Sequence, residues 1–446
     1  MNNLRPFAFL CSIILSFSLC SAQSGVWTLQ RCIERAQTAN PDIQQKQVVV
    51  DKNAISVKQA QSARLPSLSA TIEGSYNWGI SPSAEGSYIQ QNASVGTAGA
   101  SFSMPLFSGG RIGNTIKSIR LEEKASMADK EQALQDVTVN VITAYLQLLL
   151  NGELVTAARE QCKLSVAQYE RTSRLIQTGK IPSSELYESN AQIAKDSSSL
   201  VKAQGDVQLA KVDLMQLLLL KDTALFEISP ENSEMLPAFE TVRSAGVDSL
   251  YRMALRHRSS LQAARYRIDK GKADIAVARS GYYPTLDLKA NYSNGYYYYY
   301  HLPQNVLNSS FIDQYHQNRQ EVVALHLQIP IFNGFDVKHR IASAKLDMRQ
   351  QQLILITEQE QLYKLVQQTC YRIATARANY LSYQQEEEAL RKAYQSFQER
   401  FEAGKATAFE LNEKLLSLSQ AIANKIGAKY DYLFSYKTLC FYIGEL

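Results

Sequence analysis

Two pairs of glutamates have a spacing that could support chemistry in this 446-residue sequence. Glu185 and Glu188 follow a Gly-Lys dipeptide in TGKIPSSELYES, and Glu410 and Glu413 follow another in AGKATAFELNEK. Residues three apart on a helix share one face, so each pair presents two carboxylates together. Such a face could attract cations. Alternatively, glutamates in the first turn of a helix stabilise its N-terminus through the helix dipole.

The two Gly-Lys dipeptides, Gly179-Lys180 and Gly404-Lys405, each follow a long stretch of helical composition. Glycine readily adopts the left-handed conformation that ends a helix. Lysine interacts favourably with the negative end of the helix dipole. A capped turn between two antiparallel helices therefore accounts for both residue types.

No other grouping of residues predicts catalysis, a cofactor or a metal site. The sequence contains no glycine-rich phosphate loop, no Ser/His/Asp set and no paired histidines. The cysteines that follow the predicted signal are far apart and lack Cys-x-x-Cys spacing, so we expect buried free thiols. These cysteines are Cys32, Cys162, Cys370 and Cys440. The net charge of +5 is small and scattered, which argues against a nucleic-acid partner.

Residues 1–22 have the pattern of a secretory signal: Arg5, an apolar run, and small residues before a cut at Gln23. A lipoprotein cut before Cys20 is the alternative, although the bulky Leu19 is unfavourable there. No later segment has 18 consecutive apolar residues, so we expect no transmembrane helix, which needs about 20.

Two copies of one long unit make up the rest of the chain. MPLFSGG at Met104 matches IPIFNGF at Ile329, and TGKIPSSEL at Thr178 matches AGKATAFEL at Ala403, with equal separations in both copies. We predict a first unit at 23–220, a polar linker at 221–246 and a second unit at 247–446.

Each unit changes from strand to helix periodicity. Apolar and polar residues alternate within 66–107 and 284–332, which predicts one β-hairpin per unit with one apolar face. Stretches 113–178 and 338–403 then predict helices of roughly 100 Å, a length typical of coiled coils or helical barrels. Shorter return helices at 182–220 and 407–443 follow, and the helix at 41–63 is expected to complete the first long helix's antiparallel partner. The first return helix carries a heptad seam at Leu186, Ile193, Leu200, Val207 and Leu214.

Four strands are too few to close a barrel, which needs about eight. A barrel shared by several chains would satisfy both strand faces, one toward lipid and one toward a water-filled lumen. The alternative is a soluble α+β protein in which the hairpins pack on helices.

Aromatic residues extend the apolar strand faces in the run NGYYYYYH and in the first hairpin. They predict a belt at the boundary between lipid and water. A tyrosine-lined ligand loop is the alternative. The belt residues are Tyr76, Trp78, Tyr292, Tyr296, Tyr298 and Tyr300.

The sequence resembles the TolC family of outer-membrane efflux and secretion ducts. The resemblance rests on WTLQRCIERAQTANPDI, the PLFSGG and PIFNGF junctions, the two GK turns and the final YIGEL. It implies a mainly α fold with β, in which long antiparallel helical hairpins form a trimeric α-barrel below a shared twelve-stranded outer-membrane β-barrel. It also implies a homotrimeric passive duct in outer-membrane lipid, served by a periplasmic adaptor and an inner-membrane pump of the RND or ABC type. Cargo is chosen upstream, so the sequence does not distinguish drugs, metal ions and proteins.

In this family the helix turns meet the adaptor, and acidic residues line the tunnel mouth. The resemblance therefore implies adaptor docking at Gly179, Lys180, Gly404 and Lys405. It implies a mouth lined by Glu185, Glu188, Glu410 and Glu413. Three chains would bring twelve carboxylates together, which predicts a cation-selective, divalent-sensitive mouth.

The family's tyrosine and arginine gate positions are Phe401 and Ala406 here. The closed state therefore needs another contact, such as Lys405 with a neighbouring glutamate. The alternative function is a trimeric, barrel-anchored coiled-coil adhesin. Such a protein needs an external passenger segment, and the hairpin loops at 81–92 and 301–318 are short for one.

Overall fold

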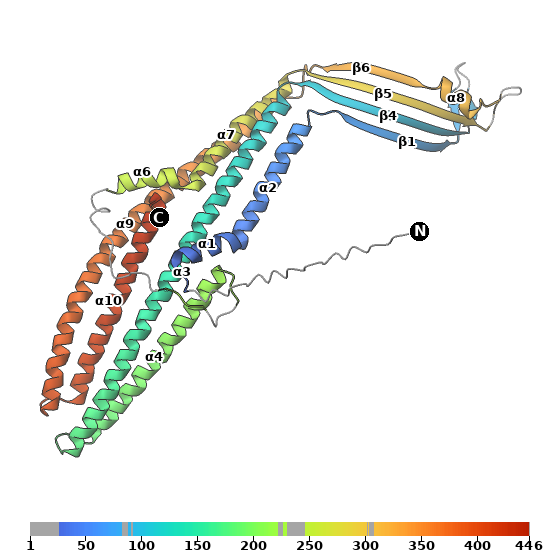
Figure 1. Ribbon diagram of the computed structural model, residues 1–446. Helices are drawn as coiled ribbons and strands as arrows, with labels where there is room; N and C mark the ends of the chain where they lie inside the picture. The colour runs from blue at the N-terminus through green and yellow to red at the C-terminus, as the bar shows by residue number, and fades with distance from the viewer. Residues whose placement is uncertain are drawn as a thin grey trace, which may run out of the picture.

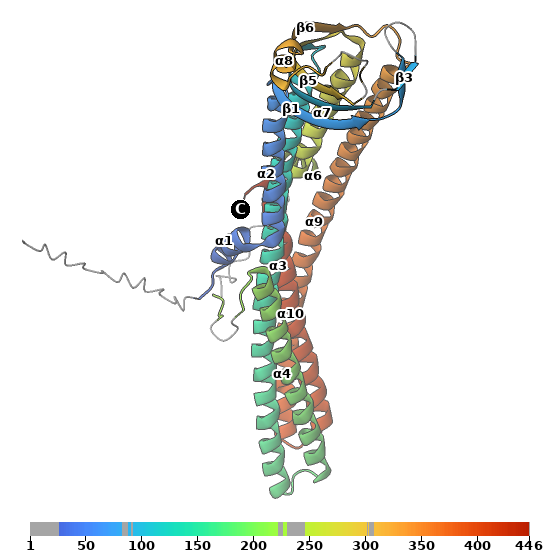
Figure 2. The same cartoon turned by 90° about the vertical axis from the view of Figure 1, so that its right-hand side faces the viewer.

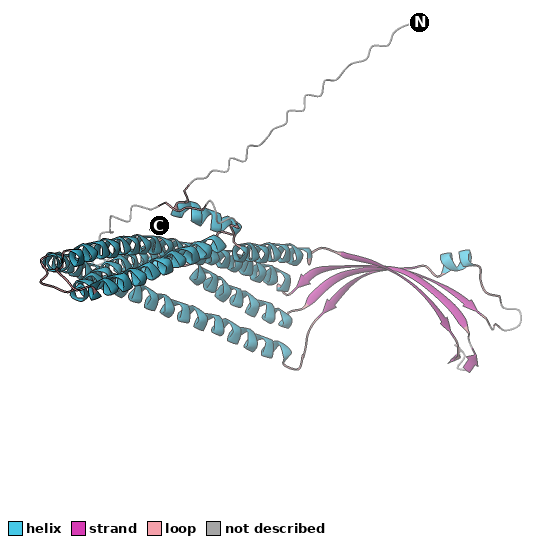
Figure 3. Cartoon of the chain, turned by 90° about the horizontal axis from the view of Figure 1, so that it is seen from below, coloured by secondary structure: helices cyan, strands magenta, loops and turns pink. Residues whose placement is uncertain are grey.

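The computed structural model describes residues 26–82, 88–90, 92–221, 226–229, 246–300, 302 and 307–445. The predicted signal with Cys20, most of the linker and parts of both hairpin loops lie outside these residues. Figure 1 shows a long array of helices with a sheet at one end, and Figure 3 shows that the strands curve.

The order of elements repeats along the chain. The first half contains α1 (Leu29–Ala39), α2 (Pro41–Ser62), β1 (Ser67–Asn77), β4 (Ala93–Ser108), α3 (Arg111–Gln177) and α4 (Ser184–Leu217). The second contains α6 (Val247–His257), α7 (Ser259–Arg279), β5 (Thr285–Tyr299), β6 (Gln320–Gln328), α9 (Asp336–Glu402) and α10 (Ala408–Ile443). The small elements are β2 (Ile80–Pro82), β3 (Tyr88–Gln90), the 3-10 turn η1 (Ser280–Tyr282) and α8 (Phe311–Gln317). The prediction of a mainly helical chain with four main strands is confirmed, whereas α8 was not expected in the second hairpin loop.

The four main strands form one antiparallel sheet in the order β1-β4-β5-β6. The two hairpins therefore join through pairing of β4 with β5. One row of directly opposed residues is Leu68, Phe102, Ala290 and Val323. The next row is Ser69, Ser101, Asn291 and Val322. Because opposed residues share a face, the register aligns the apolar sides of all four strands.

Tight turns connect the strands to the long helices. Gly109 has φ 60°, and a Cβ there would lie 2.7 Å from the Cβ of Tyr283, so only glycine fits. In the second copy Gly334 has φ 60° and Phe335 has φ 63°. A non-glycine residue in this left-handed region costs roughly 1–2 kcal/mol. The repeated Gly-containing junctions thus redirect the chain from sheet to helix.

The helices form a single curved wall (Figures 1 and 2). The α3 helix packs on α2 and α7 in the half nearer the sheet, and on α4 and α10 in the other half. The α9 helix packs on α7 and α10. Helices α2 and α4 thus follow one another along α3, and the wall has α9 at one edge and α2 with α4 at the other.

The largest apolar core joins α1, α3, α4 and α10 near the middle of this wall. Tyr145 of α3 is fully buried there, and its hydroxyl donates to the carbonyls of Trp27 and Ser229 at 3.2 and 2.7 Å. Trp27 also pairs with Ile228 in a parallel bridge. These contacts fasten the chain's first described residues to the linker.

One helix of the described chain is long and apolar enough to cross a membrane by length and composition. An 18-residue window of α3 has a mean hydropathy of 1.3, although only 28% of it is buried. This window test differs from the run of 18 consecutive apolar residues sought in the sequence, so the expectation of no transmembrane helix stays a prediction. Core helices of soluble proteins pass the same test, and α3 lies within the wall of helices.

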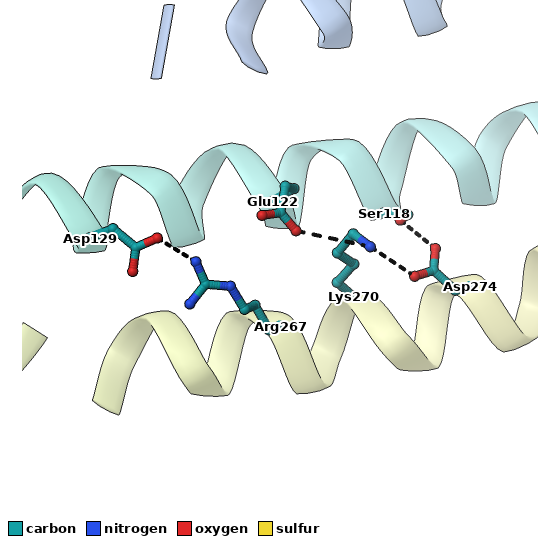
Figure 4. Close-up of polar contacts among 6 residues, drawn as sticks. All are labelled: Ser118, Glu122, Asp129, Arg267, Lys270 and Asp274. Carbon is teal, nitrogen blue, oxygen red and sulfur yellow. Dashed lines mark hydrogen bonds and ion pairs between the residues drawn. The ribbon is translucent and has the colours of Figure 1, made fainter. Parts of the chain in front are cut away.

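Charged side chains join the two repeats along the contact between α3 and α7 (Figure 4). Arg267 forms an ion pair with Asp129, and Lys270 lies 3.9 Å from Glu122 and 3.1 Å from Asp274. These side chains are about one-third exposed, so each pair contributes modestly to stability. Both pairs join an acidic residue of α3 to a basic residue of α7, so they link the first repeat to the second.

Candidate functional site at the helical tip

Both long helices end in the same hydrogen-bonded turn. Gly179 has φ 70° and Gly404 has φ 71°. The backbone N–H of Lys180 donates to Leu175 at 3.0 Å, and that of Lys405 donates to Arg400 at 2.8 Å. Together with the N–H bonds of the two glycines, these form Schellman caps. The four predicted docking residues therefore shape two matching turns at the tip.

Glu410 caps its own helix. Its carboxylate accepts from the Thr407 backbone N–H at 2.8 Å, and the Thr407 hydroxyl accepts from the Glu410 N–H at 3.2 Å. This reciprocal arrangement is a capping box. Donation by the Thr407 N–H, and next by its hydroxyl, holds the pKa of Glu410 below its usual value. The stabilising effect of a glutamate on a helix N-terminus, one of the two interpretations above, thus applies to Glu410.

Glu185 reaches from the first hairpin to the second. Its carboxylate accepts from the Ala408 backbone N–H at 2.7 Å. The N-terminus of α10 therefore receives two carboxylates, one from each repeat, as its unpaired N–H groups and dipole favour. This link uses no side chain at the position of the family's gate arginine.

Phe401 holds the tip by burial. It is fully buried in an apolar cluster with Ala408 and Leu411, and Leu175 and Ile181 of the first hairpin pack against the same cluster. Arg171 and Glu402 add an ion pair between the hairpins at 3.1 Å. Within the described residues, Lys405 is exposed and forms no ion pair.

Glu188 and Glu413 are exposed, and Glu413 lies 3.2 Å from its chain neighbour Lys414. Two large apolar side chains are also exposed near the turns, Tyr187 at 78% and Phe409 at 66%. Of the four predicted carboxylates, two are thus engaged at α10 and two are available to solvent. Among the described residues no group of His, Cys, Asp and Glu could hold a metal ion.

Toward the tip, the seam between α3 and α4 is polar, which the sequence reasoning missed. Asp196 is 6% exposed and accepts from Ser165, from Gln161 at 3.3 Å and from Gln192 at 3.0 Å. One turn further along, Gln168 is 3% exposed, and its amide atoms have no hydrogen-bond partner among the described residues. The spacing of polar residues at 161, 165, 168 and 172 could have revealed this seam.

The predicted heptad seam of α4 is fully buried at only one of its five positions. Leu186, Ile193, Leu200 and Val207 are only half-buried, whereas Leu214 is fully buried. A helix in a curved wall has a neighbour on each side, so it carries two seams. In the single chain α4 lies at an edge, and its second seam has no described neighbour.

At the other end of the molecule, aromatic rings gather on the sheet. Tyr76 lies 5.8 Å from Trp78 and 5.4 Å from Tyr300, and Tyr300 lies 5.1 Å from Tyr298, between ring centroids. The register places Tyr76 opposite Ser94 and Ser94 opposite Tyr298, on the apolar face. Tyr292 and Tyr296 lie on the same face of β5 and are less exposed.

The sequence profile described as "Outer membrane efflux protein" matches residues 32–218 and again 250–445. The chain belongs to this family. The outer membrane protein TolC of Vibrio cholerae serotype O1 is 23% identical over 447 residues, covering 98% of this chain and 95% of TolC. TolC of Escherichia coli K12 is 21% identical over 442 residues, covering 97% and 85%.

Solved structures show the same fold. A CusC structure superposes with a TM-score of 0.76 at 17% identity, covering 93% of this chain and 91% of CusC. VceC of Vibrio cholerae has a TM-score of 0.75 at 15% identity, covering 93% and 96%. As a family member, the protein is an outer-membrane exit channel for efflux or type I secretion in a Gram-negative bacterium, with a long periplasmic helical part. The family is one of transport proteins rather than enzymes.

Proposed function

We propose that three copies of this chain form a passive duct. Their sheets would make a twelve-stranded barrel in the outer membrane, and their helices would make a periplasmic tunnel. The tip would dock a periplasmic adaptor that connects it to an inner-membrane pump of the RND or ABC type. The energy would come from that pump.

The open sheet carries this proposal. Its edge strands β1 and β6 each have one side unpaired within the described chain. Its apolar face is exposed, with Leu68 at 77%, Ile72 at 88% and Val323 at 76%. An exposed apolar face with free edges is unstable in water. Joining β1 of one chain to β6 of the next removes the edges and turns the apolar face toward lipid.

The helical wall supports the same assembly. Apolar side chains are exposed at both of its edges: Leu346 of α9 at 70%, Ile55 of α2 at 64% and Leu209 of α4 at 66%. Packing α9 of one chain against α2 and α4 of the next would bury them. The half-buried heptad seam of α4 would then gain its second neighbour.

Cysteine cross-linking across the sheet edge tests the trimer. Ser69→Cys in β1 would be combined in turn with Val322→Cys, Ala324→Cys and His326→Cys in β6, which all lie on the polar face. Cys162 and Cys370, the two half-buried native cysteines, would be replaced by serine. We expect one of the three pairs to give disulfide-linked dimers and trimers on a denaturing gel.

Ser69→Cys alone is the matched control and should give no trimer ladder. Within one chain β1 and β6 lie at opposite edges of the sheet, so an intramolecular bond cannot mimic the product. Monomers from all three pairs would refute the shared barrel.

At the tip, we propose that the turns of Gly179-Lys180 and Gly404-Lys405 dock the adaptor. The exposed Tyr187 and Phe409 beside them offer apolar contacts for it. The carboxylates would ring the mouth and favour cations. Glu188→Gln/Glu413→Gln should lower the cation-to-anion permeability ratio and the divalent sensitivity in single-channel recordings.

This pair of substitutions leaves both α10 caps, those of Glu185 and Glu410, in place. Glu386→Gln is the control, because Glu386 is exposed on α9 outside the tip. Unchanged ion selectivity in the double variant would show that Glu188 and Glu413 do not make the mouth cation-selective.

A further inference from the structure

The short helix α8 is fastened to the sheet by amide side chains. Beyond the start of β6, the outer edge of β5 has no strand beside it among the described residues. Gln314 accepts from the Tyr297 N–H at 2.8 Å and donates to the Tyr297 carbonyl at 2.9 Å. Asn308 makes the same two bonds with Tyr299, each at 2.8 Å. The amides thus replace the backbone of a neighbouring strand and satisfy an exposed sheet edge.

This attachment places α8 on the apolar face of the sheet. Asn294, which shares that face with Ala98, donates to the Tyr315 carbonyl at 2.7 Å. The Phe311 ring lies 5.4 Å from that of Tyr296. Phe311, Ile312 and Tyr315 remain exposed at 63%, 67% and 50%. Gln314 of α8 therefore contacts the sheet edge, whereas Phe311 and Tyr315 lie over the apolar face and keep at least half of their surface exposed.

Glycines hollow the sheet next to α8. Gly96 of β4 lies directly opposite Gly74 of β1 and opposite Tyr296 of β5. A Cβ built on either glycine would meet no atom within 4 Å. Gly96, Gly295 and α8 line a groove of about 360 Å³, which lies within the usual size range of small-molecule sites. Its walls include Ile72, Ala98, Tyr296, Phe311 and Tyr315.

We propose that this groove binds one acyl chain of an outer-membrane lipid. The inference rests on the proposed membrane barrel, because only then does the apolar face meet lipid. The groove is continuous with that face, so a chain entering from the bilayer meets a mainly apolar lining. Tyr292, Tyr296 and Tyr315 line the groove, and tyrosines are common where lipid meets water. A bound chain would lie between α8 and the strands and cover the exposed parts of Phe311 and Tyr315.

Native mass spectrometry of the detergent-solubilised protein, with added dioleoylphosphatidylcholine as the probe, tests the groove. We expect stepwise addition of up to one tightly held lipid per chain. Gly96→Leu and Ala98→Leu should each weaken this binding about tenfold, because filling the groove displaces roughly two methylene groups of the chain. Ala290→Leu is the matched control, since it enlarges a residue on the same face outside the groove.

Equal lipid binding by Ala98→Leu, Ala290→Leu and the parent protein would overturn the proposal. So would loss of the trimer in Gly96→Leu without a change in lipid binding, because the groove would then hold a neighbouring chain. The parent protein's mass reports the trimer separately. A parent that is monomeric refutes the duct, whereas a trimer with unchanged lipid binding refutes only the groove.

Discussion

The two helical hairpins end in the same turn but differ in what lies between their helices. Toward the tip, the seam of the first hairpin, α3 with α4, buries polar side chains: Gln161, Ser165, Gln168, Thr172, Ser189 and Asp196. The tip seam of the second, α9 with α10, buries mainly apolar ones: Tyr394, Phe401, Ala408, Leu411, Leu415 and Leu418. A repeated backbone therefore does not require a repeated core.

The difference has energetic consequences. Burial of apolar area stabilises by about 25 cal/mol per Å², whereas an internal hydrogen bond contributes only about 1 kcal/mol net. The tip of the second hairpin should therefore be more stable than the tip of the first. It also covers Leu175 and Ile181 of the first hairpin, so it acts as the platform on which the first tip rests.

The largest effect is expected from Phe401→Ala. Removing this fully buried ring should destabilise the second hairpin by about 3–5 kcal/mol. Hydrogen exchange of the intact protein would show faster exchange in α9 and α10 near the tip. Phe409→Ala, which truncates an exposed ring on α10, is the control and should change stability by less than about 0.5 kcal/mol. Similar effects from both variants would contradict the apolar platform.

Gln168→Leu should act in the opposite direction. Both amide atoms of Gln168 are buried without a partner among the described residues, and an unpaired buried polar group costs about 1–3 kcal/mol. The leucine variant should slow exchange in α3 and α4 and make the two hairpins more alike. The control Gln177→Leu, at the exposed end of α3, should leave the exchange of both helices unchanged. If Gln168→Leu proved less stable than the parent protein, the Gln168 amide would have hydrogen-bond partners in the assembled protein.

Glu185→Ala tests the link between the hairpins. It removes the acceptor of the Ala408 N–H and should cost about 1 kcal/mol. Faster exchange should appear at the start of α10, although the substitution lies in α4. Glu188→Ala is the matched control on the same helix, because Glu188 is exposed. If hydrogen exchange became faster in α4 alone, the Glu185 contact would not stabilise the start of α10.

The smallest effect on stability is expected when the pH is lowered. Burial opposes ionisation of Glu387, but hydrogen bonds and charge from Lys425 and Arg391, each 2.6 Å away, outweigh it and lower its pKa from 4.5. A lowered pKa stabilises the fold above the unfolded value, and this stabilisation is lost as pH falls through the folded value. The second hairpin should therefore weaken slightly below about pH 4.5.

Glu387→Gln should flatten this part of the stability profile, whereas Glu386→Gln, at its exposed neighbour, should not. A profile that is unchanged in Glu387→Gln would show that the pair with Lys425 and Arg391 does not contribute to stability.

Local patterns in the sequence predicted much of the fold. Alternation along the strands gave the correct faces, because period two survives whatever the strand pairs with. The glycines at 179 and 404 predicted the helix ends, because left-handed caps depend on a few neighbouring residues. Pairing of β4 with β5 was not predicted, because it joins strands from different repeats.

The tip contacts were also missed, for the same physical reason. The bond from Glu185 to Ala408 joins residues that are far apart in the sequence, and its acceptor meets a backbone N–H that carries no sequence signal. The buried Asp196 has the composition of a solvated helix position, and only the packing of α3 on α4 makes it a seam residue. The amides that fasten α8 likewise resemble ordinary loop residues.

The central claim is that several chains share one barrel and conduct through it. The most direct test measures the mass of the purified, detergent-solubilised protein on an unheated gel together with its conductance in planar bilayers. The account predicts a species about three times the chain mass that forms discrete channels of small conductance, in proportion to its twelve expected strands. A monomer without conductance would contradict it, and the exposed sheet would then have to pack on helices in a soluble protein.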